Sequence, residues 1–244
     1  MSQVVLKKYG SGNIAIIAFP GWIHPIENEN KFLMLLSKKY TVYSIHLPGY
    51  MGNHDSDSFH DFTHVVNTIH DELKKIREKQ VFVGFSMGCR LIMELEKLYP
   101  DDLKKIFVGS PVNNYSIPFW SRLLLLSSSH LSLLRKSRFF KIFVVNKALK
   151  TITNDDQAVF NKENISLTGA FDSLVGLIKS QSCFENFIDS KKFIYGETDG
   201  YLAEAKNFNI KNLSVIKNAG HNCVRDNENK VFDLIDSFIK DLEV

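Results

Sequence analysis

The chain has 244 residues, of which 44% are hydrophobic and 23% charged, and its formal net charge is +3. A chain of this length and composition forms a large globular domain, and its apolar content excludes an intrinsically disordered protein.

The sequence also indicates the cellular compartment of the protein. No run approaches the roughly 18 apolar residues of a membrane-spanning helix, and the first residues lack the apolar core of a secretion signal. The three cysteines, Cys89, Cys183 and Cys223, are widely spaced and odd in number. They argue against a disulfide framework or a zinc ribbon, and they fit a reducing environment. We therefore expect a cytoplasmic protein without a transmembrane segment.

Short apolar runs rich in β-branched residues alternate with amphipathic segments along most of the chain, which predicts an α/β fold with a mostly parallel sheet and helices on both faces. One long segment, 59–79, has apolar residues on a single side of a helix, namely Phe62, Val65, Val66, Ile69 and Leu73. The predicted strands are 13–19, 41–47, 80–85, 104–110, 191–196 and 213–218. The predicted helices are 27–39, 59–79, 87–100 and 228–242.

Residues 112–188 break this alternation. They are rich in apolar residues compatible with helix and in basic residues, and they show no strand signal. We interpret this segment as a helical lid inserted across the strand ends. Residues 1–111 and 189–244 then form the core domain.

The charge is distributed unevenly. Between Leu103 and Asn154 the sequence has nine basic residues and no acidic one, and the rest of the chain has 21 basic and 27 acidic residues, a net charge of −6. Such an asymmetry bears on partners rather than on the fold. Within the lid it concentrates in Arg135, Lys136, Arg138 and Lys141.

The stretch Gly84-Phe85-Ser86-Met87-Gly88 matches the pattern G-x-S-x-G, directly after a predicted strand and at the start of a predicted helix. In this context the pattern describes a nucleophile elbow, in which a serine occupies a sharp turn between strand and helix. The helix N-terminus then presents free N–H groups to negative charge that forms at the serine. Ser86 is the predicted nucleophile; a glycine-bounded turn without chemistry is the alternative.

An activated serine needs a base, and the base needs an acid that orients it. His221 follows the last predicted strand in a loop that contains glycine, and no other histidine has such a late position. Asp199 follows the strand 191–196, and Glu197 is the alternative acid. The predicted site is therefore Ser86, Asp199 and His221, in the chain order of the α/β-hydrolases.

On these motifs the sequence resembles the α/β-hydrolase superfamily over essentially its whole length. The stretch "FPGW" (19–22) looks like the family's oxyanion loop, with Pro20 in the place where the family usually has histidine. The resemblance implies that the backbone N–H groups of Trp22 and Met87 form an oxyanion hole, which would stabilise a developing negative charge.

The resemblance implies a serine hydrolase that cleaves a carboxylic ester or thioester. Size and motif order are similar to esterases that remove a methyl group from pimeloyl–acyl carrier protein in biotin synthesis, which have "HGW" against "PGW" here. The alternatives are a menaquinone-pathway lyase of the same fold, since "SMGCR" resembles its "SMGGR", and a catalytically silent binding member. Under the lyase hypothesis Arg90 binds the substrate; otherwise it pairs with Glu94.

The lid supplies further candidate residues. Apolar residues at helical spacing are candidates to line an acyl-chain pocket, among them Phe119, Trp120, Leu123 and Leu124. A helix that packs only on the core domain is the alternative. The basic cluster suits an acidic acyl carrier protein, which we rank first, an anionic membrane surface or a small polyanionic substrate. Nucleic acid is disfavoured because the chain has no recognised binding motif.

One other pattern is weaker. The stretch "HDFTH" (60–64) resembles a zinc motif, but its acidic residue is aspartate instead of the usual glutamate, and we expect no metal. The chain has neither G-x-G-x-x-G nor a P-loop, so we expect no nucleotide cofactor. Cys89 is expected to be a small buried helix residue.

Overall fold

The computed structural model describes residues 4–22, 26–50, 53, 62–99, 103–111, 136–153, 165–179, 190–208 and 210–240. The strands are β1 (Val5–Tyr9), β2 (Ile14–Phe19), β3 (Thr41–His46), β4 (Lys79–Phe85), β5 (Lys105–Val108), β6 (Lys191–Gly196) and β7 (Leu213–Ile216). The helices are α1 (Ile26–Ser37), α2 (Phe62–Leu73), α3 (Met87–Leu95), α6 (Arg138–Thr153), α7 (Leu167–Lys179), α8 (Leu202–Asn207), α9 (Cys223–Asp226) and α10 (Glu228–Lys240), with a 3-10 turn η1 (Glu96–Leu98) after α3.

All seven strands form one sheet in the order β1-β3-β2-β4-β5-β6-β7. β1 runs antiparallel to β3, and every other pair runs parallel. Parallel neighbours need long crossover connections, and the helices in these connections cover both faces of the sheet. The predicted fold class, a mostly parallel sheet between helices, is confirmed.

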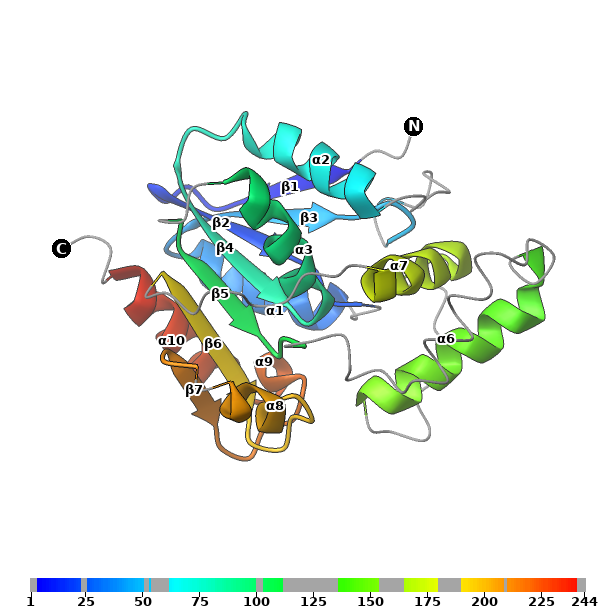
Figure 1. Cartoon of the computed structure of the whole chain (residues 1–244). Helices are drawn as coiled ribbons and strands as arrows, with labels where there is room; N and C mark the ends of the chain where they lie inside the picture. Colours follow the sequence, from blue (N-terminus) through cyan, green and yellow to red (C-terminus); the bar gives the residue numbers. More distant parts are fainter. Residues whose placement is uncertain are drawn as a thin grey trace.

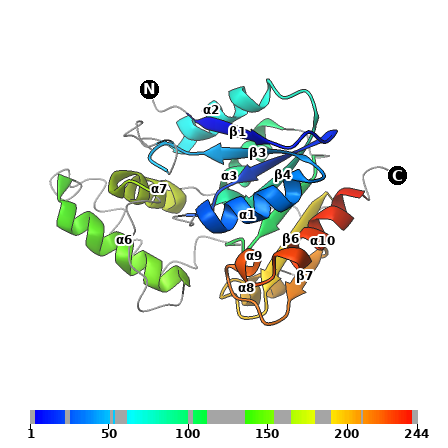
Figure 2. The same ribbon diagram turned by 180° about the vertical axis from the view of Figure 1, so that it is seen from behind.

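Two apolar clusters fill the space between the sheet and its helices. One joins the first face of the sheet to α2, α3 and α7, and the other joins the opposite face to α1, α9 and α10. Figure 1 shows α2 and α3 on the near side of the sheet, and Figure 2 shows α1 and α10 on the other side. Strands buried on both faces explain the continuous apolar runs in the sequence, such as Ile14–Phe19.

The five residues predicted for the buried side of the long helix are the buried residues of α2. The helix nevertheless ends at Leu73, six residues before the end of the predicted range. The side-chain amide of Gln80 donates to the carbonyl oxygens of Leu73 (3.0 Å) and Ile76 (3.3 Å). The Leu73 carbonyl also accepts from the Ile76 N–H at 3.1 Å. Because these hydrogen bonds cap the end of the helix, the chain can leave the helix there and enter β4.

Strand β1 was not predicted. It is an edge strand of five residues that pairs only with β3, and Lys7 and Lys8 in its middle are exposed. Lysine is common on edge strands because it discourages pairing with other chains, but it hides the apolar pattern of a strand. The short helices α8 and α9 were missed as well, since one or two turns carry little periodicity.

Helices α6 and α7 fall within the predicted insertion. They pack against each other, and α7 lies between the sheet and α6 in both views (Figures 1 and 2). Val144 and Val145 of α6 and Phe171 of α7 belong to the same apolar cluster as α2 and α3. No described helix is long and apolar enough to cross a bilayer. The boundaries of the insertion, 112 and 188, stay predictions.

Candidate active site

Ser86 lies in the turn between β4 and α3, at the carboxyl end of a central strand. Its backbone has φ 48°, a conformation that residues other than glycine rarely adopt. The Ser86 N–H donates to the Val108 carbonyl at 2.9 Å, and the Ser86 carbonyl accepts from the Cys89 N–H at 3.0 Å. These hydrogen bonds stabilise the strained turn, which presents the hydroxyl at the carboxyl end of the strands.

The two glycines beside Ser86 are required by close backbone contacts. A Cβ atom on Gly88 would lie 2.2 Å from the Phe19 carbonyl oxygen at the end of β2. A Cβ atom on Gly84 would lie 2.8 Å from the Cys89 backbone nitrogen. Both distances are shorter than any side chain tolerates, so the G-x-S-x-G pattern follows from packing α3 tightly onto β2 and β4.

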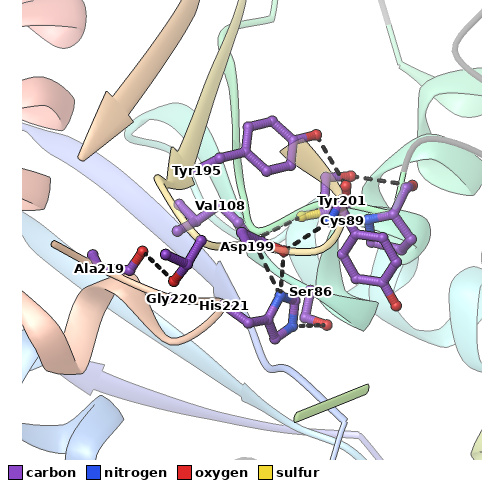
Figure 3. Close-up of polar contacts among 12 residues, drawn as sticks. Ser86, Cys89, Val108, Tyr195, Asp199, Tyr201, Ala219, Gly220 and His221 are labelled. Atoms are coloured by element: carbon purple, nitrogen blue, oxygen red, sulfur yellow. Dashed lines mark hydrogen bonds and ion pairs between the residues drawn. The ribbon is translucent and has the colours of Figure 1, made fainter. Parts of the chain in front are cut away.

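Two loops from the neighbouring strands β6 and β7 bring Asp199 and His221 to the same edge. His221 Nε2 lies 3.0 Å from Ser86 Oγ, and His221 Nδ1 lies 3.2 Å from both carboxylate oxygens of Asp199. Figure 3 shows the imidazole between the carboxylate and the hydroxyl. The three residues that the sequence singled out therefore form one continuous chain of polar contacts.

The surroundings of Asp199 keep its carboxylate in place. The Tyr201 N–H donates to Asp199 Oδ1 at 3.0 Å, and only 1% of the Asp199 side chain is exposed. The Tyr201 ring meets the His221 ring edge to face at 5.3 Å, and burial raises the pKa of the Tyr201 hydroxyl. Thr198 binds the Ala219 carbonyl through both its N–H and its hydroxyl, which ties the two loops together.

Glu197, the alternative acid, is placed elsewhere. Its side chain is exposed and accepts a hydrogen bond from the Asn218 N–H at 3.0 Å. The described contacts of His221 with a carboxylate are those with Asp199. The geometry therefore favours Asp199 over Glu197 as the partner of the imidazole.

Trp22 and Met87 follow the ends of two adjacent parallel strands, β2 and β4, in which Phe19 pairs with Gly84. Met87 is the first residue of α3, so its backbone N–H has no acceptor within the helix. Both residues are almost fully buried, with 8% of Trp22 and 1% of Met87 exposed. Backbone donors in such a shielded place interact strongly with negative charge.

The side chains of Trp22 and Met87 contact polar groups that the sequence gave no reason to expect. The Trp22 indole Nε1 donates to the Ala170 carbonyl of α7 at 3.0 Å. The hydroxyl of Tyr50, after β3, lies 3.7 Å from the Met87 sulfur and 3.4 Å from the Ser173 hydroxyl of α7. Ala170, Ser173 and Tyr201 lie outside any recognised motif, so pattern analysis had no signal for them.

Cys89 and Arg90 point away from solvent. Burial raises the pKa of the Cys89 thiol to about 12, and its Sγ atom lies 3.1 Å from the Gly84 carbonyl, so it stays a neutral core residue. Arg90 is 1% exposed, and its Nη1 atom lies 3.8 Å from the Met93 sulfur. Glu94 pairs with Lys97 at 2.6 Å.

Other predicted residues divide between described and undescribed parts of the chain. Lys136 and Arg138 are exposed, whereas Lys141 is half-buried and donates to Thr168 Oγ1 of α7 at 3.1 Å. The remaining lid candidates, Phe119, Trp120, Leu123, Leu124 and Arg135, lie outside the described residues.

For the "HDFTH" pattern, His60 is not described, and His64 is exposed on α2. Among the residues that the structure describes, no three His, Cys, Asp or Glu side chains come together as a metal site would require.

The arrangement has a defined chemical capability. A serine in contact with an imidazole, whose other nitrogen faces a buried carboxylate, can lose its proton as it attacks a carbonyl carbon. The N-terminus of α3, which begins with Met87 directly after Ser86, favours negative charge at this place.

The fold and the site can be compared with those of known proteins. A search of curated protein sequences finds no significant relative. Among solved structures, MenH from S. aureus is similar, with a TM-score of 0.75, 17% identity and coverage of 98% of this chain and 99% of that one. An esterase (EaEST) from Exiguobacterium antarcticum has a TM-score of 0.68 at 16% identity, with coverage of 98% and 96%.

A bromoperoxidase from Bacillus anthracis has a TM-score of 0.67 at 15% identity, with coverage of 98% of this chain and 96% of that one. At these identities the similarities show the fold. The family model described as "Alpha/beta hydrolase family" matches residues 16–233, which include strands β3 to β7, most of β2 and all three residues of the polar chain. The chain belongs to the alpha/beta hydrolase family.

Proposed function

We propose that the protein is a serine hydrolase that cleaves a carboxylic ester or thioester through an acyl-enzyme. One observation carries this proposal: the continuous contact from Asp199 through His221 to Ser86, with distances of 3.2 and 3.0 Å. Membership of the alpha/beta hydrolase family supports it. The strained backbone of Ser86 supports it further, because strain of this kind persists where the surrounding structure holds it.

In the first half of the proposed reaction, Ser86 Oγ attacks the acyl carbon while its proton passes to His221 Nε2. The carbonyl π electrons move to the oxygen, and the N–H groups of Trp22 and Met87 stabilise that oxyanion. The tetrahedral intermediate then collapses, and the leaving alcohol or thiol takes the proton from His221. Asp199 orients the imidazole and stabilises its positive charge.

In the second half, water attacks the acyl-enzyme and gives its proton to His221. The oxyanion forms again, the bond to Ser86 Oγ breaks, and the serine recovers its proton from the imidazole. The products are a carboxylic acid and the alcohol or thiol. No step requires a redox partner.

Labelling with a fluorophosphonate probe tests this proposal. The serine oxygen displaces fluoride from phosphorus, so intact-mass spectrometry should show one added phosphonyl group on the wild-type protein, and peptide mapping should place it on Ser86. Ser86→Ala should gain no mass. Stoichiometric labelling of the alanine variant, or of another serine in the wild type, would contradict the proposal.

Within this class, the narrower candidate is an acyl methyl ester presented by an acidic acyl carrier protein, as in biotin synthesis. Lys136 and Arg138 support it because both are exposed at the start of α6, next to Phe139, which is 88% exposed. A basic surface with an exposed aromatic ring suits an acidic protein partner. Phe119, Trp120, Leu123 and Leu124 remain the proposed lining of an acyl-chain pocket.

The alternative lyase activity needs Arg90 to bind a carboxylate-rich substrate. The similarity to MenH is compatible with this alternative. Against it, Arg90 is 1% exposed and lies beside Met93 of its own helix, so a substrate would not reach it without rearrangement. A catalytically silent binding member is disfavoured, since binding alone gives no reason to keep the contact between Ser86 and His221.

A further inference from the structure

The start of α7 and the two residues before it contact the loops that follow β2 and β3. The Ser166 N–H donates to the Gly49 carbonyl at 2.7 Å, and Ile165 forms an isolated antiparallel bridge with Tyr50. A Cβ atom on Gly49 would lie 3.1 Å from the Gly169 Cα atom, so the two backbones touch. This end of α7 is therefore packed near the carboxyl ends of the parallel strands, where Ser86 also lies.

The hydrogen bond from the Trp22 indole to the Ala170 carbonyl joins α7 to the proposed oxyanion loop. It is shielded from water, because Ala170 is fully buried and Trp22 is 8% exposed. The same carbonyl accepts from the Ser173 hydroxyl at 3.1 Å. A shielded hydrogen bond of this kind restricts the indole, and through it the backbone of Trp22.

The restriction matters because this loop departs from the pattern of the family it resembles. Pro20 stands where the family usually has histidine, and a proline has neither a backbone N–H nor a polar side chain to brace the loop. The indole bond reaches across 148 residues of sequence to supply a brace of another kind.

We propose that α7 positions the oxyanion hole through the Trp22–Ala170 hydrogen bond, so that the inserted segment takes part in the chemistry and is not only a cover. The Trp22 backbone N–H is the donor to the oxyanion, and its indole is the positioning group. This inference rests on the proposed function. If the inference is right, a substrate must enter the site without displacing the first turns of α7.

Two substitutions test the inference on the full chain. Trp22→Phe removes the N–H donor and keeps an aromatic ring, and Trp22→Leu removes both. If the hydrogen bond positions the loop, both variants should lose about 10- to 100-fold in kcat for p-nitrophenyl butyrate. KM should change by less than about threefold, because ground-state binding does not use the oxyanion hole fully.

An aryl trifluoromethyl ketone separates positioning from a general structural role. The Ser86 oxygen adds to the ketone carbon, the carbonyl oxygen becomes an oxyanion, and His221 takes the serine proton. The inhibition constant should therefore rise by the same factor as kcat/KM falls in each variant. A fall in kcat with an unchanged inhibition constant would overturn the inference. So would wild-type kcat in Trp22→Phe with a loss confined to Trp22→Leu, which would make packing the cause.

Thr168→Val is the matched control. It removes a different hydrogen bond of α7, the one from Lys141 at 3.1 Å, and leaves the Trp22 contact intact. It should keep kcat within about twofold; a loss equal to that of Trp22→Phe would overturn the specific role of the indole. Ser86→Ala distinguishes a failure of this inference from a failure of the proposed function. Turnover by that variant would contradict the proposed function itself.

A measurement on a protein with an intact Trp22 covers the case in which the Trp22 variants do not fold. The chain has two tryptophans, Trp22 and Trp120, so the wild-type protein labelled with ¹⁵N-tryptophan gives two indole signals, and Trp120→Phe serves only to assign them. The Trp22 N–H should exchange slowly with solvent, and its chemical shift should change when the trifluoromethyl ketone adduct forms. Fast exchange, or a signal that ignores the adduct, would overturn the inference.

Discussion

The His221 Nδ1 atom lies 3.2 Å from both carboxylate oxygens of Asp199, and the carboxylate is almost completely shielded from solvent. Such a symmetric, shielded contact favours the tautomer with the proton on Nδ1, and under the proposed function Nε2 then accepts the proton of Ser86. The contact also fixes the orientation of the imidazole.

Asp199→Asn should lower kcat about 10³- to 10⁴-fold, because an amide N–H at this place favours the wrong tautomer and cannot stabilise the imidazolium. Steady-state ester hydrolysis measures the effect. Glu197→Gln is the matched control; it alters an exposed carboxylate in the same loop and should stay within about twofold of wild type. The reverse ranking would assign the acid to Glu197.

Gly88→Ala should cost several kcal/mol of unfolding free energy, because its Cβ would collide with the Phe19 backbone at 2.2 Å. Loss of soluble folded protein, or a large fall in Tm, is the expected result. Gly200→Ala is a control in the loop beside Asp199, where a Cβ meets nothing within 4 Å. A Gly88→Ala protein as stable as Gly200→Ala would show that α3 does not pack as described.

Asp236 of α10 should make stability depend on pH. Burial alone would raise its pKa, but hydrogen bonds from Lys240, Lys39 and Tyr40 outweigh this and lower the pKa to about 2. The folded pKa is below the unfolded value, so the stabilisation is complete above about pH 4 and is lost as the pH falls towards 2. Urea unfolding should place Asp236→Asn below wild type at pH 7 by about 1 kcal/mol, with the gap narrowing towards pH 3. A gap independent of pH would contradict this.

Lys136→Glu combined with Arg138→Glu should raise KM for an acyl ester bound to an acidic carrier protein and leave hydrolysis of p-nitrophenyl butyrate unchanged. Exposed charges are screened, so the wild-type carrier reaction should also weaken as salt rises. The control pair, Lys38→Glu with Lys230→Glu, makes the same charge change at exposed positions, one directly after α1 and one on α10. Equal effects of the two pairs, or no salt dependence, would argue against carrier binding.

The sheet could be predicted from the sequence because its central strands are buried on both faces and therefore read as apolar runs. The elements that were missed or misjudged depend on contacts that no local pattern shows. β1 is an edge strand with two exposed lysines, and α2 ends where the side-chain amide of Gln80, which lies in the next strand, caps it. Their pattern is either diluted or overridden by tertiary structure.

The candidate site divides in the same way. Ser86, Asp199 and His221 were predictable because G-x-S-x-G and the loops after the last strands have a recognisable order. The contact of Trp22 with Ala170 was not, since it joins residues 148 positions apart and one of them is an alanine that acts through its backbone. Every residue has a backbone carbonyl, so the residue type does not show which carbonyl accepts a hydrogen bond.

The hydrolysis of a simple ester by wild type and by Ser86→Ala tests the central claim most directly. Both proteins should fold alike, as judged by their thermal unfolding, because the substitution keeps the Cβ atom at the strained turn. The account predicts that kcat/KM for p-nitrophenyl butyrate falls by at least about 10³-fold in the alanine variant, to a residual rate from binding and oxyanion stabilisation. A variant that keeps turnover within about tenfold of wild type would contradict it.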